Sequence, residues 1–106
     1  MGVTNLIEQQ IKDHDVVLYM KGTPQSPMCG FSANVVQVLT LLKVPFHSID
    51  VMENMTIRQL VKEYSNWPTI PQLYVNSEFI GGCDIVREMY NTGDLQKLFC
   101  QKKSFN

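Results

Sequence analysis

The residue best suited to chemistry in this sequence is Cys29, which lies in the run Pro27–Gly30. An apolar stretch over 16–20 predicts a strand before it, and apolar residues at helical spacing predict a helix over 31–43 after it. Cys29 is therefore expected at a helix N-terminus, where unpaired backbone N–H groups and the helix dipole favour the thiolate over the thiol. We interpret Cys29 as a nucleophilic or metal-ligating sulfur rather than a buried small side chain.

A second thiol is missing from the position where proteins with a C-x-x-C motif carry one. Ser32 stands there, and a hydroxyl cannot resolve a mixed disulfide formed on Cys29. The other cysteines, Cys83 and Cys100, are far apart in the chain. An odd number of cysteines at wide spacings is typical of reduced thiols in a reducing compartment. We interpret Cys100 and the two histidines as structural or incidental, since no metal-ligand spacing surrounds them.

Hydrophobic periodicity predicts a small mixed sheet flanked by helices. The expected helices cover 5–12, 31–43, 55–64, 85–90 and a last segment from 94 to 99, and the expected strands cover 16–20, 46–50, 72–75 and 78–81. Thr4, Asn54 and Asp84 are the expected N-caps of three helices. The helix after Cys29 would connect two parallel strands, and the last two strands would form an antiparallel hairpin. Residues 21–28 are rich in glycine, proline and serine and are expected to form an ordered loop.

Four short segments carry a resemblance to a known family. Lys21–Pro24 reads K-G-T-P, Cys29–Ser32 reads C-G-F-S, Trp67–Pro71 reads W-P-T-I-P, and Gly81–Asp84 reads G-G-C-D. A lone C-G-F-S would be weak, but all four in this order, with matching spacing and context, are a strong signal. The chain resembles the monothiol glutaredoxins of the C-G-F-S type. The resemblance implies an α/β, thioredoxin-like fold, with a four-stranded mixed sheet flanked by about five helices, in one glutaredoxin domain over 1–106.

The resemblance also implies glutathione as a ligand. Glutathione has carboxylates, an ammonium, peptide units and a thiol, so its site needs cations, an anion and exposed backbone. We expect Lys21 and Arg58 to bind the glycyl carboxylate, since an arginine can form a bidentate pair with it. The alternative for both is solvated surface charge. Phe31, close to Cys29 in the sequence, is expected to border the ligand.

The other half of the expected site includes backbone groups. In the resembled family the proline peptide of the segment Thr69–Pro71 is cis, and the residue before the proline, here Ile70, offers its backbone to the cysteinyl unit of glutathione. Gly82 would allow a close approach of the ligand. The N–H groups of Cys83 and Asp84 would bind the γ-glutamyl carboxylate, and the Asp84 side chain would bind the ammonium. Helix capping is compatible with that role of Asp84.

Two of these residues keep alternative interpretations. Trp67, the one tryptophan of the chain, either borders the glutathione site or packs in the core, as large aromatic side chains commonly do. Some members of the resembled family form a disulfide between the active-site cysteine and a cysteine at the position of Cys83. Cys83 is therefore either a resolving thiol or a small buried side chain, and we favour the buried side chain.

The resemblance further implies a [2Fe-2S] cluster shared between two subunits. Such a cluster takes four thiolate ligands, and this chain has one credible exposed cysteine. In the family, each subunit gives its active-site cysteine and one bound glutathione. We therefore expect Cys29 to be the metal ligand of a homodimer that passes its cluster to recipient proteins, with BolA-like proteins as further partners. The alternatives are a weakly active glutathione-dependent oxidoreductase that deglutathionylates proteins, and a thioredoxin-like adaptor.

Composition excludes several other classes of protein. The formal net charge is −1, so no wide basic surface is available for nucleic acid. No apolar run approaches the roughly 20 residues of a membrane span. The N-terminus resembles neither a secretory signal nor a transit peptide. We expect a bacterial cytoplasmic protein, or the processed form of a protein of the mitochondrial matrix.

Overall fold

The computed structural model describes the backbone of residues 3–101 and the side chains of residues 6–100. A four-stranded sheet lies at its centre, in the order β4-β1-β5-β6. Its strands are β1 (Val16–Met20), β4 (His47–Asp50), β5 (Gln72–Val75) and β6 (Glu78–Gly81). β1 pairs parallel with β4 and antiparallel with β5, and β5 and β6 form an antiparallel hairpin. The mixed sheet expected from the sequence is confirmed.

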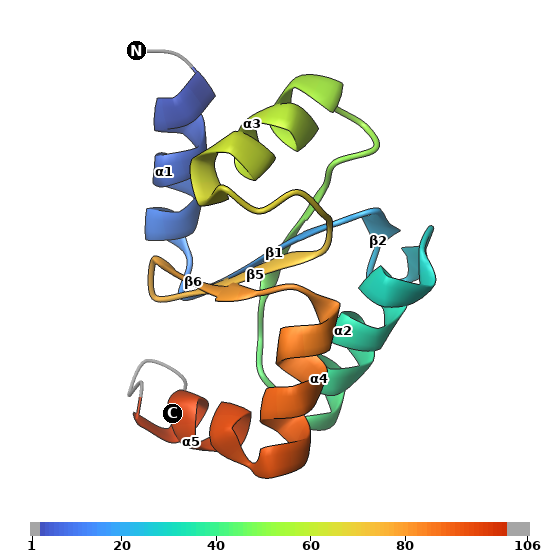
Figure 1. Cartoon of the computed structure of the whole chain (residues 1–106), viewed down its shortest axis with the longest axis vertical. Helices are drawn as coiled ribbons and strands as arrows, with labels where there is room; N and C mark the ends of the chain where they lie inside the picture. The colour runs from blue at the N-terminus through green and yellow to red at the C-terminus, as the bar shows by residue number, and fades with distance from the viewer. Residues whose placement is uncertain (1–2, 102–106) are drawn as a thin grey trace.

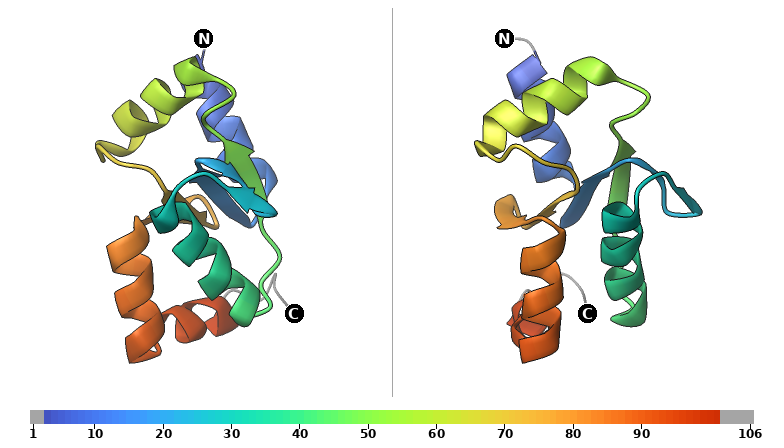
Figure 2. Two further views of the ribbon diagram at one scale, coloured as in Figure 1. Left: turned by 90° about the vertical axis from the view of Figure 1, so that its right-hand side faces the viewer. Right: turned by 45° about the vertical axis from the view of Figure 1, so that its right-hand side comes forward.

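Within residues 3–101, five helices cover the two faces of this sheet (Figure 1). One layer holds α1 (Val3–Asp13) and α3 (Met55–Ser65), and the other holds α2 (Gly30–Leu41), α4 (Cys83–Thr92) and α5 (Asp94–Gln101). The two views of Figure 2 show the same layers from the side, with the sheet between them. None of these helices has the length and apolar character needed to cross a membrane.

The central strand β1 explains why both faces of the sheet are covered. Val16, Leu18 and Met20 pack in the cluster with α2, α4 and α5, whereas Val17 and Tyr19 pack in the cluster with α1 and α3. Successive side chains of a strand point to opposite faces, so an unbroken apolar run requires cover on both sides. Full burial of one such side chain contributes roughly 1.5–3 kcal/mol relative to exposure. The strand therefore lies at the centre of the fold, as its sequence predicts.

Two helix boundaries on opposite faces of the sheet differ from the prediction. α1 begins at Val3, so Thr4 lies inside the helix and is not its N-cap, and the Thr4 side chain is outside the described part of the chain. α2 ends at Leu41, two residues earlier than predicted. It ends there because Lys43 takes a left-handed backbone conformation, with φ of 58°, which stops a helix.

The start of α4 also differs from the prediction. Its N-cap is Gly82, which has an extended backbone and makes no side-chain cap hydrogen bond, so Asp84 is not the cap. The carbonyl of Gly82 already accepts the first helical hydrogen bond, from the N–H of Val86 at 3.0 Å. Asp84 lies instead in the first turn, where a carboxylate still interacts favourably with the helix dipole. The helix therefore begins at Cys83, and Gly82 is the one residue between it and the end of β6 at Gly81.

Residues 21–28, expected to be an ordered loop, contain a short hairpin of β2 (Gly22–Thr23) and β3 (Ser26–Pro27). The N–H of Met28 donates to the carbonyl of Lys21 at 2.8 Å and closes the loop. The N–H of Gly22 donates to Oδ1 of Asp50, at the end of β4, at 2.9 Å. These hydrogen bonds fix the segment that leads from β1 to Cys29.

The two histidines that the sequence left without a role lie together at the edge of the sheet. The rings of His14 and His47 stack with their centroids 3.9 Å apart and an angle of 12° between their planes. Burial, and then the charge of His14, lower the pKa of His47. His47 is the first residue of β4, and neither histidine lines the cavity described below.

Gly22 is a position where only glycine fits. Its φ is +89°, and a Cβ there would lie 2.5 Å from the carbonyl oxygen of Ser26 and 2.7 Å from the backbone nitrogen of Met28. Gly22→Ala should lower the free energy of unfolding by about 1–3 kcal/mol, because backbone atoms of the hairpin must move. Gly30→Ala is the matched control, since no atom lies within 4 Å of its Cβ position. Denaturant unfolding measures both, and equal stabilities of the two variants would contradict the strain at Gly22.

Candidate functional site

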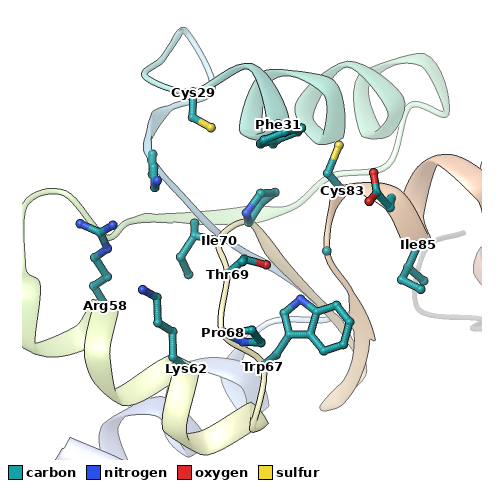
Figure 3. A pocket seen from close by; sticks show the side chains of 14 residues that line it. Cys29, Phe31, Arg58, Lys62, Trp67, Pro68, Thr69, Ile70, Cys83 and Ile85 are labelled. Atoms are coloured by element: carbon teal, nitrogen blue, oxygen red, sulfur yellow. The ribbon is translucent and has the colours of Figure 1, made fainter.

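A cavity of about 530 Å³ lies where the end of β1, the start of α2, the inner side of α3 and the start of α4 meet (Figure 3). This volume is within the range of roughly 300–1,000 Å³ typical of small-ligand sites. All residues selected from the sequence line it. They are Lys21, Cys29, Phe31, Arg58, Trp67, Thr69, Ile70, Gly82, Cys83 and Asp84. The fold thus brings four sequence segments and one helix together around a single space.

The cavity has further lining residues that the sequence analysis missed. They are Lys62, Pro68, Pro71 and Ile85. Lys62 could have been found, because it follows Arg58 by four positions on the predicted helix and therefore shares its face. The Ile70–Pro71 peptide is cis, as the resemblance implied. Ile85 is 40% exposed and adds an apolar patch at the rim.

Cys29 occupies the N-cap position of α2, with an extended backbone. The backbone N–H of Ser32 is the main cause of a lowered pKa of the Cys29 thiol. Burial opposes this effect, while the N–H of Phe31 and the ammonium of Lys21 lower the pKa further. The first turn of a helix offers such unpaired N–H groups, so the position stabilises a thiolate. Cys29 is half-buried and faces the cavity (Figure 3).

Ser32, which replaces the second cysteine of a C-x-x-C motif, is fully buried. Its Oγ accepts a hydrogen bond from the backbone N–H of Lys21 at 3.1 Å. The hydroxyl therefore links the end of β1 to the first turn of α2. This bond holds the two segments that carry Lys21 and Cys29 in a fixed relation to each other.

Three cations gather at one end of the cavity. Arg58 and Lys62 extend from α3 toward the cavity, below Cys29 in Figure 3, and Lys21 follows β1. In the described part of the chain none of the three forms an ion pair, and the Arg58 guanidinium lies 4.0 Å from the sulfur of Met55. Cations that lack carboxylate partners can form charge-assisted hydrogen bonds with an anionic ligand. This end of the cavity is suited to a carboxylate.

The opposite end of the cavity is formed by the start of α4. The helix begins at Cys83, so the N–H groups of its first turn have no helical acceptor. Such a terminus attracts an anion, and the exposed Asp84 beside it can pair with a cation. Gly82 leaves little room for a side chain, because a Cβ there would lie only 3.2 Å from the Pro71 carbonyl oxygen and from Nε1 of Trp67. This end is therefore suited to a group that carries both a carboxylate and an ammonium.

The structure bears on both residues that kept alternative interpretations. The Trp67 ring packs against Phe79 with centroids 5.8 Å apart and also lines the cavity, so packing and bordering the cavity occur together. Cys83 is 7% exposed and belongs to the cluster with α2 and α4. Its Sγ lies 3.9 Å from Nδ2 of Asn34. The burial of Cys83 agrees with the interpretation that the sequence favoured, although its side chain still reaches the cavity wall.

The sequence profile of the glutaredoxin family matches residues 16–80, and the chain therefore belongs to this family. Several of its relatives are named monothiol glutaredoxins. The chain is 54% identical over 92 residues to the ycf64-like monothiol glutaredoxin of Synechocystis sp. The aligned region covers 87% of this chain and 86% of that protein. It is 51% identical over 98 residues to glutaredoxin 4 of Buchnera aphidicola subsp. Schizaphis graminum, with 92% of each chain covered.

A solved structure from this family has the same fold. The solution structure of reduced poplar apo GrxS14 is 48% identical and superposes with a TM-score of 0.82, covering 93% of this chain and 91% of that one. The thioredoxin-like glutaredoxin fold expected from the sequence is confirmed.

The causes of the lowered Cys29 pKa can be tested separately. Lys21→Gln should raise the pKa of Cys29 relative to the unmodified protein, because it removes a positive charge that favours the thiolate. Lys62→Gln is the matched control, because Lys62 lines the same cavity but is not among the causes of the shift. The pH dependence of Cys29 alkylation by iodoacetamide, followed by peptide mass spectrometry, gives the pKa. Equal values for the two variants would contradict the assigned role of Lys21.

Proposed function

We propose that this chain binds glutathione in the cavity and, as a homodimer, carries a [2Fe-2S] cluster that it transfers to recipient proteins. The observation that supports this most directly is the Cys29 thiolate position beside a cavity with a cationic end and a helix N-terminal end. The cluster is the cargo of the protein, and the site residues are proposed as its holders.

Glutathione matches the two ends of the cavity in charge. Its glycyl carboxylate would lie by Lys21 and Arg58, with Lys62 as a further cation on the same helix. Its γ-glutamyl carboxylate and ammonium would lie at the start of α4, near Asp84. Ile70 would meet the central cysteinyl unit through its backbone. The tripeptide thiol would then lie on the side of the cavity that holds Cys29.

The number of available ligands supports a shared cluster. A [2Fe-2S] cluster takes four thiolates. In the part of the chain that the structure describes, no three side chains of the His, Cys, Asp or Glu type converge on a possible metal position. Cys29 fits the role of one ligand, because its position favours the thiolate that iron binds. Two copies of Cys29 and two glutathione thiolates would complete the set.

Exchangeable ligands favour a carrier over a permanent holder of the cluster. Glutathione binds through hydrogen bonds and ion pairs that a recipient protein can displace, so the bridged dimer can separate during transfer. Exposed apolar side chains beside the cysteine would cover the cluster in the dimer. Phe31 is 59% exposed and Met28 is 68% exposed. Recipient proteins and BolA-like proteins would approach the same face.

The lowered pKa of Cys29 also supports a second function, the deglutathionylation of proteins. The Cys29 thiolate would attack the glutathione sulfur of a mixed disulfide and release the protein thiolate. A second glutathione thiolate would then attack the Cys29–glutathione disulfide, regenerating Cys29 and forming oxidised glutathione. Ser32, buried and hydrogen-bonded to Lys21, cannot replace that second glutathione.

Anaerobic reconstitution with iron, sulfide and glutathione separates the two functions. The protein should become coloured and dimeric, as measured by ultraviolet-visible absorption and size-exclusion chromatography. Cys29→Ser should lose the cluster, whereas Cys100→Ser, which removes an exposed thiol outside the cavity, should keep it. Cys83→Ser should also keep it. If the protein stays colourless and monomeric and turns over rapidly in a glutathione-coupled disulfide assay, cluster transfer is contradicted and deglutathionylation is the function.

The proposed carboxylate contact of Arg58 has a measurable size. Arg58→Ala should weaken glutathione binding by about 1.5–3 kcal/mol, the range for a hydrogen bond to a charged group. Arg87→Ala is the matched control, because Arg87 is exposed on α4 and does not line the cavity. NMR titration of the reduced protein with reduced glutathione gives both affinities. If Arg58→Ala binds as tightly as Arg87→Ala, Arg58 is not part of the site.

A further inference from the structure

The segment Trp67–Pro71 forms one wall of the cavity and has no regular secondary structure. Irregular backbone of this kind must have its polar groups paired by other parts of the protein. Directly after it lies Gln72, the first residue of β5, which is fully buried. Gln72 does not line the cavity. Its contacts point to a role in holding the segment rather than in touching a ligand.

The side-chain amide of Gln72 makes three hydrogen bonds. Nε2 donates to the carbonyl oxygen of Trp67 at 3.1 Å and to that of Thr69 at 3.2 Å. Oε1 accepts from the hydroxyl of Tyr74 at 3.2 Å. A carbonyl oxygen only accepts hydrogen bonds, so the amide must turn its Nε2 toward the two carbonyls and its Oε1 toward Tyr74. An amide donates two hydrogen bonds and accepts one here, which neither a carboxylate nor an apolar side chain can do.

Tyr74 holds the acceptor side of this arrangement. It is 1% exposed, and its ring contacts those of Tyr19, Tyr64 and Phe79. Burial raises the pKa of Tyr74 to about 12, so its hydroxyl remains a donor at neutral pH. The position of the Gln72 amide is therefore set in part by Tyr74, a buried side chain that does not line the cavity.

The pairing is selective along the segment. The carbonyls of Trp67 and Thr69 are paired by Gln72, while no hydrogen bond of the Ile70 backbone is found in residues 3–101. The peptide groups of Ile70, which lines the cavity, therefore stay available to a ligand. From this arrangement we propose that Gln72 is a positioning residue: it holds the Trp67–Pro71 segment so that the Ile70 backbone can bind the ligand. This inference rests on the proposed binding of glutathione.

The test compares Gln72→Met with Leu95→Ala. Methionine conserves volume but cannot pair the two carbonyls. Leu95 is fully buried in the cluster on the opposite face of the sheet, so its truncation lowers stability without touching the segment. NMR titration with reduced glutathione should show at least about fivefold weaker binding for Gln72→Met, the loss expected from unpairing two carbonyls. Leu95→Ala should bind within about twofold of the unmodified protein.

Two further measurements separate positioning from a general loss of structure. The rate of Cys29 alkylation should stay within about twofold in both variants, because neither substitution removes a group that lowers the Cys29 pKa. Backbone ¹⁵N relaxation without glutathione should show lower order at Thr69 and Ile70 in Gln72→Met alone. If Gln72→Met does not fold, Tyr74→Phe replaces it, since it leaves Oε1 unpaired while keeping the ring contacts, and weaker binding is again expected.

Unchanged affinity in the Gln72 or Tyr74 variant overturns the inference, as does an equal loss in Leu95→Ala. If the unmodified protein binds no glutathione, the proposed function fails instead. The relaxation measurement then still decides whether Gln72 holds the segment, and unchanged order at Thr69 and Ile70 in the variant would reject that role.

Discussion

The stabilisation of negative charge on the Cys29 sulfur is the interaction on which the rest of the site depends. The sulfur lies at the N-cap of α2, and the backbone N–H of Ser32 contributes most to its lowered pKa. This stabilisation requires only that the helix begins where it does and that Lys21 stays close. The buried hydroxyl of Ser32 secures both, since it accepts the N–H of Lys21 at 3.1 Å. Thiolate chemistry and local structure are therefore coupled through one short turn.

Around the sulfur, irregular segments form the walls of the cavity, and buried or half-buried side chains hold them. Asp50 accepts the N–H groups of Gly22 and Met52, and so holds the hairpin before Cys29 against the end of β4. Gln72 pairs two carbonyls of the segment before β5. In both cases a polar side chain at a strand end pairs backbone groups that no sheet or helix could pair. The strands thereby fix the position of the irregular segments around the cavity.

Much of the fold was predictable because local chemistry and global packing agree. The apolar run of β1 predicted a strand covered on both faces, and it is buried throughout. Asn54 was the expected cap of α3, and its Oδ1 accepts the N–H groups of Thr56 and Ile57 at 3.0 and 3.1 Å. The cap of α4 was predicted wrongly. Asp84 is a good cap by type, but β6 ends at Gly81 and α4 begins at Cys83, so Gly82 takes the cap position between them.

The sequence by itself determined the single thiol of the C-G-F-S segment and the order of the helices and of the strands of the central sheet. It also supplied the charged residues that a ligand with charged groups at both ends would need. These depend on neighbours along the chain, where spacing and side-chain chemistry are sufficient. Only the tertiary structure decided that Lys21, Arg58 and Asp84 face one cavity, that Lys62 joins them, and that Gln72 pairs Trp67 and Thr69. The physical reason is that these relations follow from strand register, helix rotation and the burial of one amide, which arise when distant segments pack together.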